Sequence, residues 1–407
     1  MTLSEELQWR GFVNQTTFKD LKDLDKSKRT FYHGFDASAD SQTIGNLAAM
    51  MFDKVFIRHG YKAILLAGGS TSLIGDPGGK DKERILQDEE TITKNVANAA
   101  EEIKRVFQGE PFELVNNLDW TKQMTVIEYL RDIGKHFSMT PLVQRDYIAK
   151  RIGQEGAGIS YAEFSYTILQ GLDYLHLFDK FGATLQLGGS DQWGNCLSGV
   201  DLIRRARGKE VHVITLPLII NKATGKKFGK SEEGAVWLNA SKTSVYQFYQ
   251  FWLNMDDEGV EGYLKVYTEL SKPEIDQLMD DFSKDKAARA AQKTLAYQVT
   301  KLVHGQSEAN SAVRSTEVLF GKSSFLELSE EEKTKLSQEL PATPFQGSLA
   351  QTLVKAGLAN SNSEASRFID AGSISINGRK VDASWDSFEK GKNLVKRGKN
   401  SFAIVEK

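Results

Sequence analysis

Short apolar runs alternate with helical patterns in the first half of the chain, and this alternation restricts the fold more than any other feature. Residues 61–67 read Tyr-Lys-Ala-Ile-Leu-Leu-Ala and are followed by Gly68-Gly69, which is typical of a buried strand that ends in a turn. Residues 91–107 have the spacing of an amphipathic helix, and residues 211–220 form a second strong strand pattern. The alternation predicts an α/β fold with a doubly wound parallel sheet, in which ligands bind at the carboxyl ends of the strands.

The pattern changes after residue 240. Residues 241–325 have helical periodicity throughout and predict an α-helical domain. Residues 326–347 contain three consecutive glutamates and two prolines, which favours a linker with one short helix. Residues 348–407 predict a small α+β module: a helix over 351–356, a second helix capped by Ser363, and a hairpin at Asn377-Gly378. We therefore expect domain boundaries near residues 240, 325 and 347.

Composition places the chain among ordinary globular proteins. Its 407 residues are 40% hydrophobic and 26% charged, with one cysteine, Cys196. A single cysteine excludes an internal disulfide and fits a reducing compartment, so we expect an inert, partly buried thiol and a cytoplasmic location. We expect the acidic, amphipathic N-terminus to be neither a signal nor a transit peptide. No apolar run reaches membrane-spanning length, so no membrane partner is expected.

Charge is distributed unevenly. Ten Lys and Arg residues and six Asp and Glu residues lie in 348–407, a balance of +4, whereas the whole chain carries −2. A positively charged segment in an otherwise negatively charged chain favours a nucleic-acid contact in residues 348–407. On charge alone, a solvated basic face is the slightly better explanation of the asymmetry.

Three glycine-rich or lysine-rich segments carry the strongest chemical signals. Residues 187–195 read Leu-Gly-Gly-Ser-Asp-Gln-Trp-Gly-Asn, where glycines allow close backbone approach to a ligand and polar side chains can hold a hydroxyl or an amide. Residues 227–231 read Lys-Phe-Gly-Lys-Ser, and two lysines three positions apart suit a polyphosphate. Residues 68–80 end in Gly-Asp-Pro-Gly-Gly-Lys, but Asp81 after Lys80 fails the phosphate-loop pattern.

The helical segment 161–173 carries a polar stripe. Tyr166, Gln170 and Asp173 are spaced four and three residues apart, so they share one helix face. Because the flanking residues are apolar, this stripe is expected to face a ligand site rather than solvent.

Together with Tyr-His-Gly-Phe-Asp at 32–36 and Thr-Ile-Gly-Asn at 43–46, these segments resemble the motifs of bacterial-type tyrosyl-tRNA synthetases, which are class I aminoacyl-tRNA synthetases. The first class I motif is usually His-Ile-Gly-His, so both of its histidines are absent here. The resemblance implies a Rossmann-like catalytic domain over 1–240 with a dimer-interface insertion at about 119–150, an α-helical anticodon-binding domain over 241–325, a linker over 326–347 and an S4-like RNA-binding domain over 348–407.

The resemblance also implies site residues. For tyrosine they are Tyr32, Asp76, Asn117, Tyr166, Gln170, Asp173 and Gln192. For ATP they are Gly34, Asp36, Gly45, Asn46, Gly189, Asp191 and Lys230. For catalysis they are Ser38, Thr43, Asn46, Lys80, Arg84, Lys227, Lys230 and Ser231. For tRNA they are Arg367, Arg379, Lys380, Lys396 and Arg397. His33 is expected to have a structural role beside the pocket, and no protein metal site is expected.

The implied reaction joins L-tyrosine and ATP to tyrosyl-adenylate and pyrophosphate, and then transfers tyrosine to the 3′ end of tRNA(Tyr) in a homodimer. The carboxylate nucleophile is already ionised, so catalysis needs positioning and charge stabilisation rather than a general base. Mg²⁺ would accompany the phosphates of ATP. Tyr32 and Asp173 would bind the phenolic hydroxyl; tyrosyl enzymes are themselves the standard example of rejecting phenylalanine in this way without editing.

Two rival interpretations remain open at this level. The missing histidines allow a synthetase relative that has lost activation chemistry and only binds RNA. A tryptophanyl enzyme shares the fold and the lysine segment but should lack the Tyr32 and Asp173 pair. Residues 43–46 alone also fit a simple capping turn before a helix that begins at Leu47.

Overall fold

The computed structural model describes residues 1–407 except 79–85, 154–155, 157, 221–224, 226–227, 229, 232–233, 322, 383–384 and 386–387. The chain divides into two compact units. The first contains residues 1–243 and 254–295, and the second contains residues 244–253 and 296–407. Among the described residues, no helix combines the length and the apolar character that crossing a membrane would require.

A six-stranded sheet forms the centre of the first unit. Its strands are β1 (Gln15–Thr16), β2 (Thr30–Asp36), β3 (Lys62–Gly68), β4 (Phe112–Asn116), β5 (Ala183–Gly189) and β6 (His212–Leu216). Their order is β1-β6-β5-β2-β3-β4, and all neighbours are parallel except β1 and β6. Because β2 lies between β3 and β5, the strand order reverses there, which confirms the predicted doubly wound sheet.

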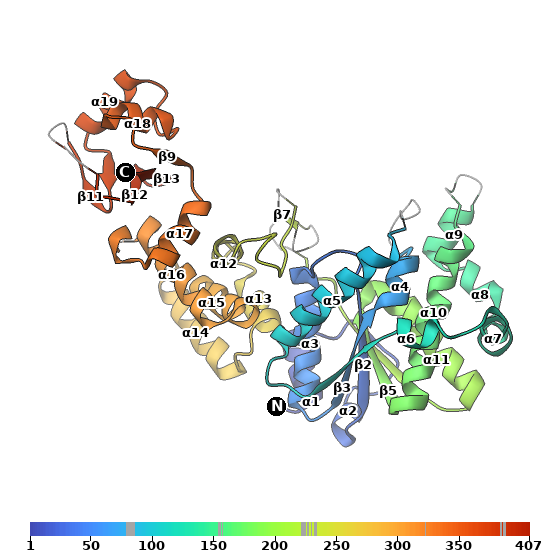
Figure 1. The fold of residues 1–407 in the computed structure, drawn as a ribbon. Helices are drawn as coiled ribbons and strands as arrows, with labels where there is room; N and C mark the ends of the chain where they lie inside the picture. Colours follow the sequence, from blue (N-terminus) through green and yellow to red (C-terminus); the bar gives the residue numbers. More distant parts are fainter. Residues whose placement is uncertain are drawn as a thin grey trace. The chain divides into compact units, whose positions relative to one another are not determined.

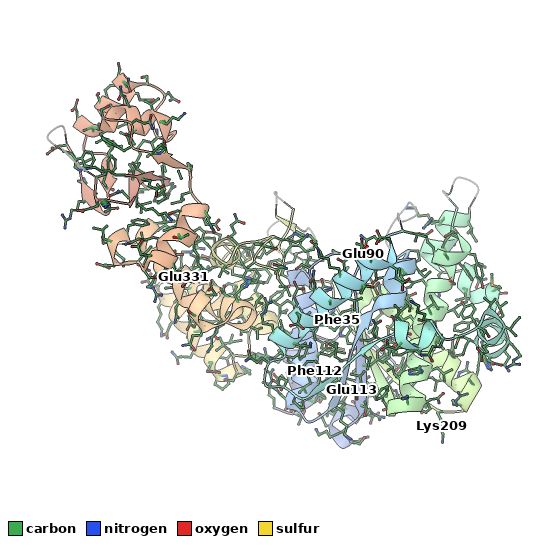
Figure 2. All side chains as sticks on the ribbon, viewed as in Figure 1. Phe35, Glu90, Phe112, Glu113, Lys209 and Glu331 are labelled. Carbon is green, nitrogen blue, oxygen red and sulfur yellow. The ribbon has the colours of Figure 1, made fainter. Side chains whose placement is uncertain are left out.

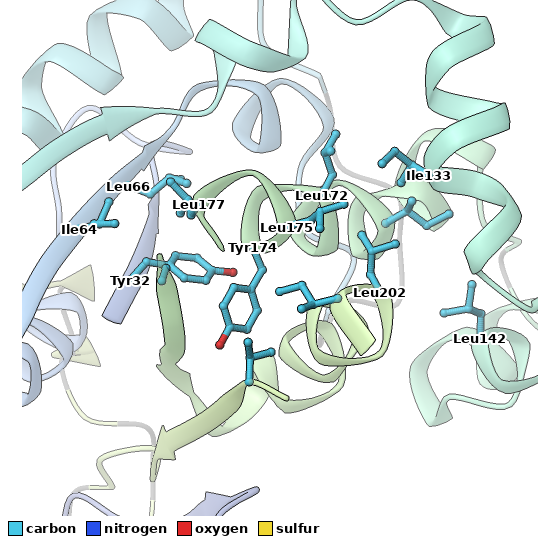
Figure 3. Close-up of a cluster of buried hydrophobic side chains, with 14 of the residues drawn as sticks. Tyr32, Ile64, Leu66, Ile133, Leu142, Leu172, Tyr174, Leu175, Leu177 and Leu202 are labelled. Carbon is cyan, nitrogen blue, oxygen red and sulfur yellow. The ribbon is translucent and has the colours of Figure 1, made fainter. Parts of the chain in front are cut away.

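Helices cover both faces of this sheet. The longer helices of the whole unit are α1 (Leu3–Arg10), α3 (Ile44–Arg58), α5 (Glu89–Val106), α10 (Tyr161–Phe181), α11 (Trp193–Arg207), α13 (Val260–Tyr267) and α14 (Lys272–Lys284). In Figure 1, α3 and α5 lie on one side of the sheet and α10 and α11 on the other. Figure 2 shows the side chains that fill these layers, including Phe35 on β2 and Phe112 on β4. On the α10 side, the rings of Tyr32 and Tyr174 pack with centroids 5.0 Å apart (Figure 3).

Short elements complete the first unit. They are α2 (Asp23–Lys26), α4 (Gly69–Ile74), α6 (Leu118–Thr121), α7 (Val126–Glu128), η1 (Tyr129–Ile133), η2 (Gly134–His136), α8 (Met139–Val143), α9 (Asp146–Ile152), η3 (Ser190–Gln192), β7 (Lys230–Ser231), β8 (Gly234–Ala235) and η4 (Lys286–Ala288). The predicted strand over 211–220 was too long, because β6 ends at Leu216. Pro217 follows it and has no backbone N–H for the ladder.

The second unit joins helices to an antiparallel-rich sheet. Its helices are α12 (Val245–Leu253), α16 (Gln306–Phe320), η5 (Phe325–Glu327), α17 (Glu330–Gln338), α18 (Leu349–Lys355) and α19 (Asn362–Asp370), while α15 (Ala290–His304) crosses the division at residue 295. Its strands are β9 (Ala342–Pro344), β10 (Ile374–Ile376), β11 (Arg379–Lys380), β12 (Lys392–Arg397) and β13 (Ser401–Glu406), in the order β11-β10-β12-β13-β9.

Two details of this unit differ from expectation. Ser361, not Ser363, caps α19, because its side chain accepts a hydrogen bond from the backbone N–H of Glu364. The segment expected to be a linker contributes β9, which pairs in parallel with β13. The hairpin is confirmed: Asn377 and Gly378 have φ of 49° and 85°, as a tight turn with two left-handed residues requires.

Candidate active site

A pocket of about 430 Å³ opens at the carboxyl ends of β2 and β5, where the strand order reverses. Twelve of the predicted site residues line it: Tyr32, Gly34, Asp36, Thr43, Gly45, Asn46, Tyr166, Gln170, Asp173, Gly189, Asp191 and Gln192. They come from β2, from the start of α3, from α10 and from the segment after β5. Segments more than 150 residues apart in sequence therefore form one cavity.

One end of the pocket contains a buried carboxylate. Asp173 accepts hydrogen bonds from Asn117 Nδ2 at 3.0 Å and from Trp120 Nε1 at 2.9 Å. Burial raises the pKa of Asp173 to about 7, and the two hydrogen bonds oppose this shift. The buried hydroxyl of Tyr32 has no hydrogen-bond partner among the described residues. A buried polar group that lacks a hydrogen-bond partner costs folding free energy unless a ligand or a water supplies that partner. This end of the pocket therefore suits a polar group of a ligand.

Further carboxylates line the middle of the pocket or lie beside it. Tyr166 donates its hydroxyl to Asp36 Oδ2 at 2.7 Å, so α10 and β2 are joined across the cavity. Asp76 lies behind Gln192, whose Nε2 donates to Asp76 Oδ2 at 2.6 Å. These acids can attract an ammonium group.

The other end of the pocket is the start of α3. Thr43 is the N-cap of this helix, and Asn46 Oδ1 accepts hydrogen bonds from Thr43 Oγ1 at 2.9 Å and from the Thr43 backbone N–H at 3.0 Å. The helix therefore begins at Ile44 rather than at Leu47, because Thr43 and Asn46 form a capping box. A helix N-terminus that lines a pocket favours negatively charged ligand groups such as phosphates.

His33 lines the pocket and is held by a buried carboxylate of α3. Its Nδ1 is 2.7 Å from Oδ1 of Asp53 on α3, and both side chains are buried. Burial raises the pKa of Asp53, although the imidazole partly opposes that shift. This contact fixes the orientation of the ring, and the structural role expected for His33 stays a prediction.

The lysine-bearing segments are described only in part. Lys80, Arg84 and Lys227 lie outside the described residues, and Lys230 and Ser231 are described as the backbone of β7, which pairs with β8. Phe228, between the two lysines, is buried and stacks on Tyr263 with ring centroids 4.5 Å apart.

Ser38 is not brought into the pocket. It is exposed, and its carbonyl accepts a hydrogen bond from Gln87 Nε2 at 3.4 Å. The predicted catalytic set is therefore only partly assembled within the described part of the chain.

Sequence reasoning missed three residues near the buried carboxylate of Asp173: Trp120, Thr71 and Gln186. Trp120 joins the predicted Asn117 in holding Asp173, and Thr71 Oγ1 accepts from Asn117 Nδ2 at 3.2 Å and donates to Asp36 Oδ1 at 2.9 Å. Gln186 lines the pocket with a buried, unpartnered Oε1. Gln186 could have been identified from the sequence, because it is a polar residue within the apolar β5 strand. Trp120 left no such signal, and Thr71 lies in the glycine-rich segment 68–80 but was not singled out within it, since both roles depend on contacts distant in sequence.

The predicted RNA-binding residues divide into two groups. Arg367, Arg379 and Lys380 are exposed. Lys396 donates to the carbonyl of Leu319 at 2.7 Å and lies over the ring of Phe402, and Arg397 Nη1 donates to the carbonyl of Leu358 at 2.7 Å. The first group is available to a partner, whereas the second already has partners within the unit.

Comparisons with known proteins identify the family of the chain. The profile of the family described as "tRNA synthetases class I (W and Y)" matches residues 24–321, and that of the "Tyrosine--tRNA ligase SYY-like C-terminal domain" matches residues 332–405. A tyrosine--tRNA ligase of Geobacillus kaustophilus is 41% identical over 421 aligned positions, which cover 100% of this chain and 99% of the relative.

Solved structures give the same result. A C-terminally truncated mitochondrial tyrosyl-tRNA synthetase from Aspergillus nidulans has a TM-score of 0.70 and 29% identity, covering 78% of this chain and 94% of that chain. The corresponding protein from Coccidioides posadasii has a TM-score of 0.68 and 32% identity, with 77% and 91% covered. The chain belongs to the class I tRNA synthetases of the tryptophan and tyrosine family, and within it to the bacterial-type tyrosine--tRNA ligases.

Proposed function

We propose that this chain activates L-tyrosine with ATP and transfers the tyrosine to the 3′ end of tRNA(Tyr). The observation that carries the proposal is the single pocket in which a buried carboxylate and an unpartnered tyrosine hydroxyl lie at one end and the N-terminus of α3 lies at the other. The first end matches a phenol, and the second matches a phosphate.

Each substrate group has a proposed set of residues. The phenolic hydroxyl binds between Tyr32 and Asp173, and the ammonium group binds near Tyr166, Gln170 and Asp76, with Gln192 beside them. Adenine lies against the glycine turn at Gly45, in line with the glycines of β2 and β5. The tyrosine carboxylate then attacks the α-phosphorus, and the bond from that phosphorus to the oxygen of the leaving pyrophosphate breaks. Lys80, Arg84, Lys227 and Lys230 are proposed to balance the charge that develops on the phosphates.

Mg²⁺ is proposed to enter with ATP. The carboxylates of Asp36 and Asp76 already accept hydrogen bonds from Tyr166, Thr71 and Gln192. We therefore propose that the phosphate oxygens of ATP, rather than these two carboxylates, supply most of the ligands of this hard cation.

The assembly is proposed to be a homodimer through the segment 119–150. This segment exposes large apolar side chains, with Val126 at 72%, Ile127 at 67% and Met139 at 58% of full exposure. Contiguous exposed apolar surface is typical of an interface between subunits. The proposed site of action is the cytoplasm, which suits the single thiol of Cys196, a free and buried cysteine whose pKa is raised by burial.

The RNA-binding roles are proposals of the same kind. Residues 241–325 are assigned to the anticodon end of the tRNA, residues 326–347 to a connection and residues 348–407 to a basic S4-like surface. The exposed Arg367, Arg379 and Lys380 support the last assignment.

A tyrosine-dependent ATP–pyrophosphate exchange assay tests the proposal. Exchange with tyrosine, and none with phenylalanine or tryptophan at the same concentration, is expected. No exchange by the folded protein would favour the relative that has lost activation chemistry, and exchange with tryptophan would favour the sister enzyme.

Lys230→Ala and Lys227→Ala are expected to lower the single-turnover rate of adenylate formation much more than the affinity for tyrosine. The reason is that their charges are proposed to act mainly on the transition state. Stopped-flow measurement of adenylate formation at saturating tyrosine checks this expectation. Unchanged rates in both variants would contradict the lysine assignment.

Thr43→Ala is expected to lower kcat/KM for ATP by only about 1–2 kcal/mol, the scale of one neutral hydrogen bond left unmade. It should also destabilise the fold by about 1 kcal/mol, because Thr43 caps α3. Thr43→Ser keeps the hydroxyl and serves as the control in both urea denaturation and exchange.

Lys80→Ala should cost more than Thr43→Ala; the opposite order would refute this distribution of roles.

A further inference from the structure

Glu102 is a buried carboxylate on α5 that the proposed reaction does not use. It is 4% exposed, and its Oε1 accepts a hydrogen bond from Ser41 Oγ at 2.7 Å, while its Oε2 accepts from the Gln42 backbone N–H at 2.7 Å. Both donors come directly before Thr43, the capping residue of the α3 turn that lines the pocket. The carboxylate therefore holds the beginning of this turn from outside the pocket.

The same turn is paired with the segment that follows β8. The Ile44 N–H donates to the carbonyl of Val236 at 3.1 Å, and the Leu238 N–H donates to the carbonyl of Gln42 at 2.9 Å. Thr43 and Trp237 form an antiparallel bridge between these hydrogen bonds. Residues 42–44 and 236–238 thus form a short two-stranded clamp.

Ser41 extends the contact of Glu102 to the far side of the clamp. Its Oγ accepts a hydrogen bond from the Asn239 backbone N–H at 3.2 Å. Lys242 reinforces the pairing, because it forms an ion pair with Asp40 and lies over the ring of Trp237. Glu102, Ser41 and Asn239 therefore connect three separate segments: α5, the α3 turn and the chain beyond β8.

We infer that Glu102 is a positioning residue that sets the α3 turn relative to the β7–β8 hairpin, and so aligns two segments proposed to bind ATP. The inference rests on the proposed function of these segments. Glu102 does not line the pocket, and it acts through Ser41 and Gln42. Removal of its two hydrogen bonds leaves the buried Gln42 N–H without this acceptor, and leaves the Ser41 hydroxyl only the carbonyl of Gln42 at 3.0 Å, so the link between α5 and the clamp is lost.

The test compares Glu102→Ala with Glu102→Gln and with Glu101→Ala as a matched control. Glu101 is the next residue on α5, with a side chain 67% exposed and paired with Lys104 at 2.8 Å. Glu102→Ala is expected to raise the Kd for a non-hydrolysable ATP analogue, measured by calorimetry on the full chain, about tenfold. The Kd for tyrosine should stay within about twofold, because the tyrosine end of the pocket has no contact with Glu102. Glu102→Gln should restore most of the analogue affinity, because an amide can accept from Gln42 and donate to Ser41.

Ser41→Ala supplies a second, independent variant. It removes the hydroxyl between Glu102 and Asn239, so it should also weaken binding of the ATP analogue. The double variant Ser41→Ala with Glu102→Ala should lose less binding free energy than the sum of the losses in the two single variants. Additive effects, an unchanged analogue Kd in folded Glu102→Ala, or an equal weakening of tyrosine binding would overturn the inference. Pyrophosphate exchange by the wild-type protein separately decides whether the proposed function holds.

Discussion

Asp173→Ala is expected to reduce discrimination between tyrosine and phenylalanine by about 2–4 kcal/mol in kcat/KM. Tyrosine loses a charge-assisted acceptor for its hydroxyl, whereas phenylalanine has no hydroxyl that could use one. Exchange kinetics with both amino acids measure the difference. Asp179→Ala is the control on the same helix, since Asp179 pairs with Arg207 at the surface. An equal effect on both amino acids would show that Asp173 does not read the hydroxyl.

The same carboxyl makes tyrosine use depend on pH. Its pKa is raised from 3.8 to about 7 by burial, so it becomes protonated as the pH falls below about 7 and loses the charge that attracts the phenolic hydroxyl. KM for tyrosine should rise over that range in the wild type but not in Asp173→Asn.

The sign for stability is opposite: ionised Asp173 costs folding free energy above about pH 7, and this cost disappears as the pH falls toward 4. Asp173→Asn should therefore unfold no more readily than the wild type at pH 8.

Replacing Arg367, Arg379 and Lys380 together by alanine is expected to lower kcat/KM for tRNA charging by on the order of 2–4 kcal/mol, with pyrophosphate exchange unchanged. Each is exposed, and hydrogen bonds to charged groups contribute about 1.5–3 kcal/mol before solvent screening. The slope of log K for tRNA against log salt should shrink by about 0.7–0.9 for each phosphate that is no longer neutralised. Filter binding at several salt concentrations measures it.

The control for this triple variant removes the same charge elsewhere. Lys19, Lys22 and Lys209 are exposed on the first unit, and their joint replacement by alanine should leave charging intact. Substitution is a sharper test than deletion of residues 348–407, because Leu394 and Ile404 pack with Val318 and Leu336 in one core. Full charging by the basic triple variant at limiting tRNA would remove the RNA-binding role.

Local patterns predicted the sheet, and the helix face that lines the pocket, because these signals were periodic or glycine-bounded. The stripe of Tyr166, Gln170 and Asp173 faces the cavity, since residues at helical spacing share a face whatever surrounds them. The predicted ends of some elements were wrong because a nearby side chain sets them. The start of α3, for example, depends on the hydrogen bond from the Thr43 N–H to Asn46.

The supporting contacts could not be predicted in the same way. Glu102 reads as one more glutamate on an amphipathic helix, and only the fold shows that it faces Ser41, 61 positions earlier in the chain. Trp120 is likewise one aromatic residue among many until its indole N–H is found at Asp173. Pairings between such distant residues depend on strand order, which single-residue patterns do not encode.

The position of β13 bears on when each function can arise during synthesis. β13 pairs with β12 on one side and with β9 on the other, and its Ala403 and Val405 complete a buried core. Because β13 lies farthest along the chain, β9 has no strand to pair with until β13 has left the ribosome. Every residue that lines the pocket precedes Val236. The pocket proposed to bind tyrosine can therefore form on a nascent chain whose C-terminal module, proposed to bind RNA, is still incomplete.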